Sequence, residues 1–281
     1  SGLAPRETNA PPRETNTQPQ ARPADVPPPK PIDYKKGEDV NAEGQPTDIF
    51  GSTSGPTFIP LVSGSGYFVN AVYQDVSGAP AASFGANMVA SFDATGRLTQ
   101  FKPSSGSPVI GIGSGSQADF GSDGVLAWGR WTGTVDLNGA PMTYSANQGL
   151  HYVVGMPTPT MPISGSATYT LMGASQPTYM AGNTAPGTLT GASLTATFLS
   201  TAVNLSLSMT VAMPDRTYLM NGSGTGSGSS FTLSPSTSGC FSGCSSTVFG
   251  FFAGASADRV GLTYHISDSP NNVFGAAALK K

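Results

Sequence analysis

From about residue 55 onward, hydrophobic and polar side chains alternate along the chain with a period of two. In 203–211, Val, Leu and Met residues alternate with Asn, Ser and Thr, and similar alternation recurs in 165–173 and 187–198. This period is typical of β-strands with one buried face and one face in water. No segment shows the 3.6-residue period of an amphipathic helix, so the sequence predicts an all-β fold.

Turn-forming residues separate the alternating segments. Asn138-Gly139 predicts a type I′ hairpin, because both positions accept a positive φ. The glycine-rich segments 111–121 and 222–230 are predicted to be hairpin loops. Strands in this number close into a barrel or stack as a sandwich, and the hairpin spacing favours an antiparallel up-and-down β-barrel of about eight strands. The predicted strands are 66–73, 87–93, 97–101, 125–135, 150–155, 165–173, 187–198, 203–211, 216–221, 230–233, 248–253, 259–266 and 272–279.

The first part of the chain has a different composition. It is dense in proline, nearly lacks aromatic residues and repeats PRETN at 5–9 and 12–16. Such a segment buries too little apolar surface to offset the entropy of ordering it. We therefore expect a disordered proline-rich tether over 1–54 and a β-barrel domain over 55–281. An alternative is that the PPPKP segment docks on a partner.

Charge is scarce in the predicted barrel. Only 10% of all residues are charged, against about one quarter in an average soluble protein. Residues 1–50 hold six of the 13 Lys and Arg residues and eight of the 16 acids, and no Glu follows Glu43. Ser, Thr, Asn and Gly hydrate the remaining surface, a profile that favours an exported or cell-surface protein. The net charge of −3 gives no attraction for nucleic acid.

The expected compartment is the bacterial envelope: outer membrane-associated, cell surface or periplasm. No apolar run reaches the roughly 18 residues of a membrane-spanning helix. No signal peptide is visible, and Ser1-Gly2 resembles the start of a trimmed chain. A transmembrane β-barrel is the alternative, because a period of two does not say which face meets lipid. It is disfavoured because aromatic residues form no girdles at the predicted strand ends.

The two cysteines lie close together as Cys240-Phe-Ser-Gly-Cys244. This spacing differs from the C-x-x-C redox motif, and the chain has no second pair to complete a zinc site. In an exported protein, a small disulfide-closed ring is predicted. The alternative is two unpaired thiols in a loop.

Trp128-Gly-Arg-Trp131 is the sharpest local feature. Residues three apart on a strand point to opposite faces, so Trp131 is expected in the core. Trp128 and Arg130 share the other face, where we predict that they stack on the outside. Exposed Trp and Arg are common interface anchors, so they are candidate binding residues. The alternative is a structural cation–π pair that covers a barrel wall.

His151 and His265 are the only two histidines. His265 alternates with the apolar row of strand 259–266 and so faces away from it, which makes it a third candidate binding residue. A Ser-His-Asp catalytic triad needs a serine nucleophile positioned beside the histidine, and the sequence has no Gly-x-Ser-x-Gly nucleophile elbow. The acidic residues lie mostly in predicted turns. We therefore predict no catalytic residue, no metal site and no cofactor.

The C-terminal segment resembles that of bacterial surface lipoproteins of the transferrin-binding protein B type. There, a Gly-Phe-(Phe/Tyr)-Gly-Pro-x-Ala-x-Glu-(Leu/Val)-Gly-Gly segment precedes a closing strand with a Gly-Ala-Phe-like ending. Ala253-Gly254-Ala255 departs from the Gly-Pro of that pattern. The matching residues here are Gly250, Phe251, Phe252, Ala257, Asp258, Val260, Gly261 and Gly275-Ala276-Ala277.

The proline-rich lead, the WGRW segment and the segment HYVVGMPTPTMPISGSATYTLMG (151–173) are similar to the branch of these barrels found in FecR-like envelope proteins. The resemblance implies an exported eight-stranded barrel, and it carries over no transferrin site.

These observations predict a non-catalytic envelope or cell-surface module that binds a protein partner through barrel loops and one wall. One alternative is a structural subunit of an envelope assembly, whose proline-rich arm orders on a neighbour. Another is a carrier of a small ligand, such as haem, in the barrel lumen.

Overall fold

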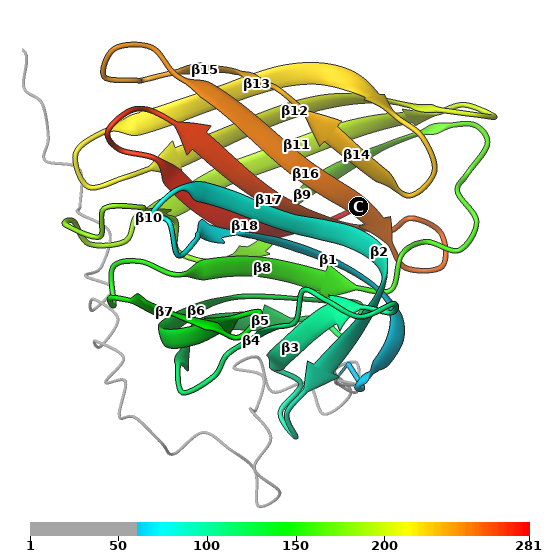
Figure 1. The fold of residues 1–281 in the computed structure, drawn as a ribbon. Coiled ribbons are helices and arrows are strands. Elements are labelled where there is room, and N and C mark those ends of the chain that lie inside the picture. Colours follow the sequence, from blue (N-terminus) through cyan, green and yellow to red (C-terminus); the bar gives the residue numbers. More distant parts are fainter. Residues whose placement is uncertain (1–60) are drawn as a thin grey trace, which may run out of the picture. The chain divides into compact units, whose positions relative to one another are not determined.

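The computed structural model describes residues 61–281. Within this range every regular element is a β-strand and all pairings are antiparallel. The strands fall into two sheets that follow one another along the chain (Figure 1). The predicted tether over 1–54 lies outside the described residues.

The N-terminal sheet contains a closed barrel of six strands. Its order is β4-β3-β2-β1-β8-β6, and β4 pairs with β6 to complete the ring, while β5 and β7 add to β6. Trp131, Tyr152 and Phe101 fill its interior. The strands are β1 (Gly64–Gln74), β2 (Pro80–Phe92), β3 (Leu98–Pro103), β4 (Ile110–Gly111), β5 (Ser116–Ser122), β6 (Leu126–Leu137), β7 (Ala140–Tyr144) and β8 (Leu150–Gly155).

The C-terminal sheet has the order β14-β16-β17-β18-β9-β11-β12-β13-β15, with β10 paired to β18. The end strand β15 also reaches back to β16, the second strand at the other end of this order, because the Thr237 and Ser246 hydroxyls lie 2.6 Å apart. The strands are β9 (Ser166–Ala174), β10 (Thr178–Tyr179), β11 (Thr188–Phe198), β12 (Val203–Ala212), β13 (Thr217–Gly226), β14 (Ser230–Leu233), β15 (Ser236–Ser238), β16 (Ser245–Ala253), β17 (Arg259–Ser267) and β18 (Val273–Lys280).

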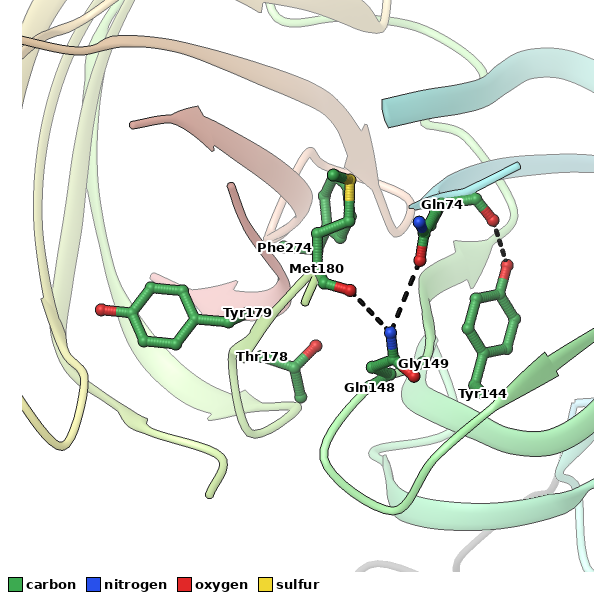
Figure 2. A pocket seen from close by; sticks show the side chains of 8 residues that line it. All are labelled: Gln74, Tyr144, Gln148, Gly149, Thr178, Tyr179, Met180 and Phe274. Atoms are coloured by element: carbon green, nitrogen blue, oxygen red, sulfur yellow. Dashed lines mark hydrogen bonds between the residues drawn. The ribbon is translucent and has the colours of Figure 1, made fainter. Parts of the chain in front are cut away.

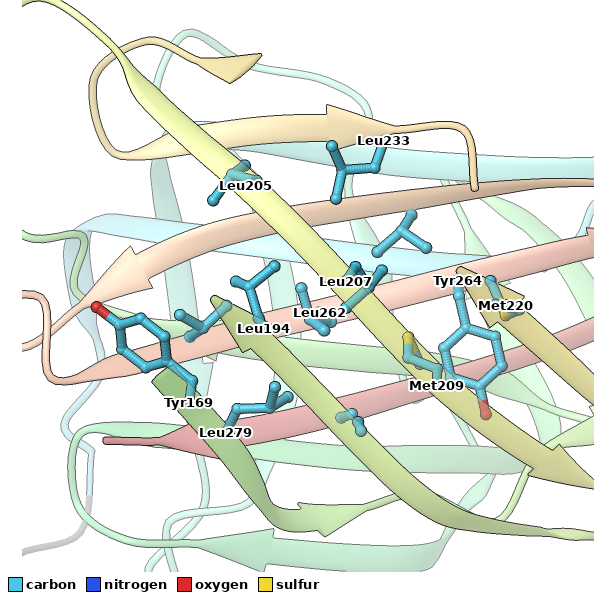
Figure 3. Close-up of a cluster of buried hydrophobic side chains, with 14 of the residues drawn as sticks. Tyr169, Leu194, Leu205, Leu207, Met209, Met220, Leu233, Leu262, Tyr264 and Leu279 are labelled. Carbon is cyan, nitrogen blue, oxygen red and sulfur yellow. The ribbon is translucent and has the colours of Figure 1, made fainter. Parts of the chain in front are cut away.

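Alternating side chains of the C-terminal sheet gather into one apolar core. Leu194 of β11, Leu207 of β12 and Leu262 of β17 point into the same space, together with Tyr169 and Tyr264 (Figure 3). The period of two in the sequence therefore places one face of each strand inside this curled sheet.

A third apolar cluster joins the two sheets through their outer faces. Phe68 of β1 stacks on Phe251 of β16, with ring centroids 4.8 Å apart. Trp128, Val153 and Ala278 complete this contact from β6, β8 and β18. β18 is buried on both faces, which explains its nearly continuous run of small apolar residues.

The predicted all-β antiparallel class with a closed barrel is confirmed. The strands are shared between two sheets because several of them bury both faces, which a period of two does not reveal. The Asn138-Gly139 turn is confirmed, with φ of 60° and 83°. The predicted loop character of the two glycine-rich segments is right only in part: turns lie at 113–114 and 228–229, but Ser116–Ser122 forms β5, and β13 continues to Gly226.

Candidate binding surface

Trp128 lies between the two sheets and is only 8% exposed, so its predicted position on the outside is wrong. Its indole ring packs over Gly121 of β5 and Gly173 of β9, where an added Cβ would lie 2.3 Å and 2.2 Å from the ring. The side chain points to the predicted face of β6, but the C-terminal sheet covers that face. A direct role for Trp128 in partner binding stays a prediction.

Arg130 is also buried, at 3% exposure, and does not stack on Trp128 from the outside as predicted. Its Nε donates to Asp119 of β5 at 2.7 Å, and its Nη1 donates to the carbonyls of Ala146 and Gln148 at 2.8 Å. Asp119 in turn accepts the Gln176 N–H at 2.9 Å. The Asp119 carboxylate, held by the guanidinium, therefore ties the N-terminal sheet to the segment between β9 and β10.

His265 lies on the outer face of β17, opposite the apolar row, as the alternation predicts. It is half-buried, and its ring lies 5.1 Å from that of Phe274. Burial lowers its pKa below the ordinary value. Its role in binding remains a prediction.

His151 is fully buried where β8 meets the C-terminal sheet. Its Nδ1 and Nε2 lie 2.8 Å from the hydroxyls of Ser175 and Thr178, respectively. Burial, and secondly the charge of Arg130, hold the pKa of His151 well below the ordinary value. The imidazole is thus neutral and structural: neither it nor Ser175 reaches solvent, so substrate has no access to this pair.

The predicted disulfide is present and joins Cys240 to Cys244. Phe241, inside this short ring, is 73% exposed. The guanidinium of Arg216 lies 5.6 Å from the centroid of the Phe241 ring. The disulfide loop, residues 240–244, therefore presents an aromatic ring at the surface, with the guanidinium of Arg216 beside it.

A buried carboxylate holds the disulfide loop in place. Asp268, at 0% exposure, accepts the Phe241 N–H at 3.1 Å. The same carboxylate pairs with Arg216 at 3.2 Å and accepts the Tyr218 hydroxyl at 2.9 Å. Burial, opposed by a bond to Tyr179 and reinforced by Asp268, raises the pKa of Tyr218 to about 12, so its hydroxyl stays protonated as a donor.

Sequence reasoning missed Phe241, Arg216 and Asp268 as parts of one site. An aromatic residue between two cysteines is itself a usable signal, because a five-residue ring is too small to bury it. Asp268 lies far from both partners in the sequence, so only the fold brings the three together.

A second junction between the sheets is closed. Gln148 donates to the Met180 carbonyl at 2.6 Å and to the Gln74 side chain at 3.5 Å, while Tyr144 donates to the Gln74 carbonyl at 2.6 Å (Figure 2). These bonds leave no room for a water-sized molecule. This junction is part of the packing between the sheets.

No group of His, Cys, Asp and Glu residues suited to a metal ion occurs within 61–281. In the same range no helix is long and apolar enough to cross a membrane.

No family model and no curated protein matches the sequence. Among solved structures, the chain is similar to transferrin-binding protein B of Haemophilus parasuis, with 14% identity and a TM-score of 0.44 over 76% of this chain and 44% of that one. The isotype 1 transferrin-binding protein B of serogroup B Neisseria meningitidis gives 11% identity and a TM-score of 0.42, covering 76% of this chain and 43% of that one.

A protein described as a surface lipoprotein gives 13% identity and a TM-score of 0.40, over 76% of this chain and 98% of its own length. The chain thus spans less than half of the two transferrin-binding proteins. At these identities and TM-scores, no residue role and no partner is transferred from them to this chain.

Proposed function

We propose that this protein is an exported, non-catalytic module at the bacterial envelope that binds a protein partner through its disulfide loop. The observation that carries the proposal is the combination of exposure and restraint at Phe241. Its side chain is 73% exposed, while its backbone lies in a covalent ring and donates to a buried carboxylate. An aromatic ring held in solvent in this way adds almost no apolar burial to the core of its own chain.

Restraint of this kind favours binding because little conformational entropy remains to be lost on association. Aromatic residues and arginine are enriched at protein interfaces, and arginine is frequent among their hot spots. Phe241 and Arg216 supply that pair here, and the exposed Leu219 lies on β13, which starts next to Arg216.

The absence of catalysis is part of the proposal. The two nitrogens of His151 face structural hydroxyls in a site closed to solvent, and His265 packs beside Phe274. Neither histidine lies beside an exposed nucleophile and an orienting acid, which an acyl-transfer site requires. Trp128 and Arg130 fix the wall between the sheets, and a direct contact of either residue with the partner stays a prediction.

The disulfide supports the proposed compartment, and the strand-turn-strand segment near the C-terminus supports the family resemblance. A disulfide persists in an oxidising compartment, which favours the periplasm or the cell surface, with association to the outer membrane. The segment Gly250–Gly261 forms the end of β16, a tight turn and the start of β17, which is the arrangement that the transferrin-binding protein B-like motif requires. We propose the FecR-like branch of these barrels on the sequence motifs alone.

The test is retention of envelope proteins on immobilised wild type and variants. Phe241→Ala is expected to lose the retained partner, with at least tenfold weaker binding once that partner is purified, because hot-spot truncations cost about 2 kcal/mol or more. Ile163→Ala is the matched control, since Ile163 is 71% exposed but lies outside the disulfide loop. Equal retention by both variants and wild type would refute the loop as the contact.

A further inference from the structure

A cavity of about 90 Å³ lies where β1 and β2 of one sheet meet β14 and β16 of the other. We call it the aromatic groove, and define it by Phe68, Asn70, Phe84, Phe231 and Phe249. It is separate from the disulfide loop, which precedes β16. No charged residue lines it.

Ser230 and Thr232 also line the aromatic groove, but Asn70 is its most buried polar side chain and has no hydrogen-bond partner. It is only 1% exposed, and neither its Oδ1 nor its Nδ2 makes a hydrogen bond. Its neighbours across the ladders are Phe84 on β2 and Val153 on β8, which offer no side-chain donor or acceptor. A buried amide left unpaired carries the full cost of its desolvation, so such a group calls for an explanation.

Aromatic rings form a large part of the wall of the groove. Phe84 stacks on Phe249 with ring centroids 4.6 Å apart, and Phe84 remains 55% exposed, so it borders both solvent and cavity. Phe231 fills the space beside Gly250, where a Cβ would lie 2.2 Å from its ring. The glycine thus permits a wall built of rings around the Asn70 amide.

We propose that the aromatic groove binds a small uncharged ligand that carries an amide next to an aromatic or aliphatic group. The amide oxygen would accept from Asn70 Nδ2, and its N–H would donate to Asn70 Oδ1, which satisfies both orphan atoms. A charged ligand is disfavoured because no side chain of opposite charge lines the groove to offset its desolvation. The cavity volume of about 90 Å³ is several times the roughly 10–15 Å³ that one water needs, so we propose a ligand of about the size of a single ring.

Benzamide is the probe, and the ¹⁵N-labelled side-chain amide of Asn70 is the reporter. Titration is expected to shift the Asn70 Nδ2 resonances, with benzoate at least tenfold weaker. Asn70→Leu is expected to abolish benzamide binding and to raise the unfolding temperature, because it removes an unpaired buried group. Asn204→Leu, at an exposed position on β12, is the matched control and should leave binding unchanged.

Phe84→Ala is a second variant. It leaves the buried Asn70 in place and changes a side chain that is more than half exposed. It should fold normally and bind benzamide several-fold more weakly. The proposal is overturned if benzamide leaves the Asn70 resonances unmoved up to its solubility limit. It is equally overturned if Phe84→Ala and wild type bind benzamide with the same affinity.

Discussion

His151 shows how one buried side chain can set the pH response of the fold. Its pKa in the folded protein lies well below the ordinary 6.5, mainly because of burial and secondly because of Arg130. The unfolded chain therefore binds a proton near pH 6.5, whereas the folded chain does not. When the unfolded state binds more protons, stability rises with pH, so this contribution is complete above pH 6.5 and is lost as the pH falls.

We predict that the free energy of unfolding falls between about pH 7 and pH 5, and that His151 contributes up to about 1.4 kcal/mol per pH unit. Urea denaturation across this range measures the slope. His151→Gln should flatten it, even if the variant is less stable at every pH. The half-buried His265, whose pKa is also lowered by burial, is the comparison, and His265→Gln should flatten the slope less. An unchanged slope in His151→Gln would contradict this role.

Trp128 fits between the sheets only because glycines face it. A Cβ at Gly173 would lie 2.2 Å from the indole ring, so Gly173→Ala should lower the free energy of unfolding by about 1–3 kcal/mol through overpacking. Gly191→Ala is the matched control, since nothing lies within 4 Å of its Cβ position. Thermal unfolding of both variants measures this difference. Equal losses of stability would mean that the indole ring does not restrict packing at Gly173.

At the scale of elements, the disulfide loop depends on a covalent bond and on Asp268 together. We predict that the Cys240→Ser, Cys244→Ser double variant loses about 2 kcal/mol of stability at most, because the closed ring is short. The larger effect should be faster hydrogen exchange of the Phe241 amide, which donates to Asp268 at 3.1 Å. If that amide exchanges at the wild-type rate in the double variant, the disulfide does not restrain the loop.

Alternation made the long strands predictable. The segments 203–211 and 259–266 lie within β12 and β17, because each strand packs one face on the C-terminal core. The glycine-rich strands were misjudged for a physical reason. Gly121 in β5 leaves room for Trp128, and Gly224 in β13 leaves room for Leu233, so these glycines accommodate packing instead of forming loops.

The candidate site was less accessible to sequence reasoning than the strands. The Trp-Gly-Arg-Trp segment indicated the correct faces of β6, but the sequence did not show that a second sheet covers the outer one. The cysteines predicted the ring, while the contact of Asp268 with Arg216 joins positions 52 residues apart. No sequence signal singles out Asn70, because its lack of a hydrogen-bond partner arises only in the folded protein.

On the scale of the whole described region, two curled sheets pack outer face to outer face. Besides the apolar contact, polar links cross between them: Arg259 pairs with Asp123, and Gln176 donates to Asp119. This packing buries the wall that first looked like a binding surface. It leaves exposed the Phe241 side chain of the disulfide loop, which directly precedes β16 and is restrained by a covalent ring.

The most direct measurement is site-specific photo-crosslinking in intact envelopes, with a photoreactive amino acid at position 241 and, as control, at position 163. Our account predicts one discrete crosslinked protein from position 241 and none from position 163. It also predicts loss of that product when Cys240 and Cys244 are replaced by serine. Crosslinks from position 163 alone, or the same products from both positions, would contradict the assignment of the disulfide loop as the partner contact.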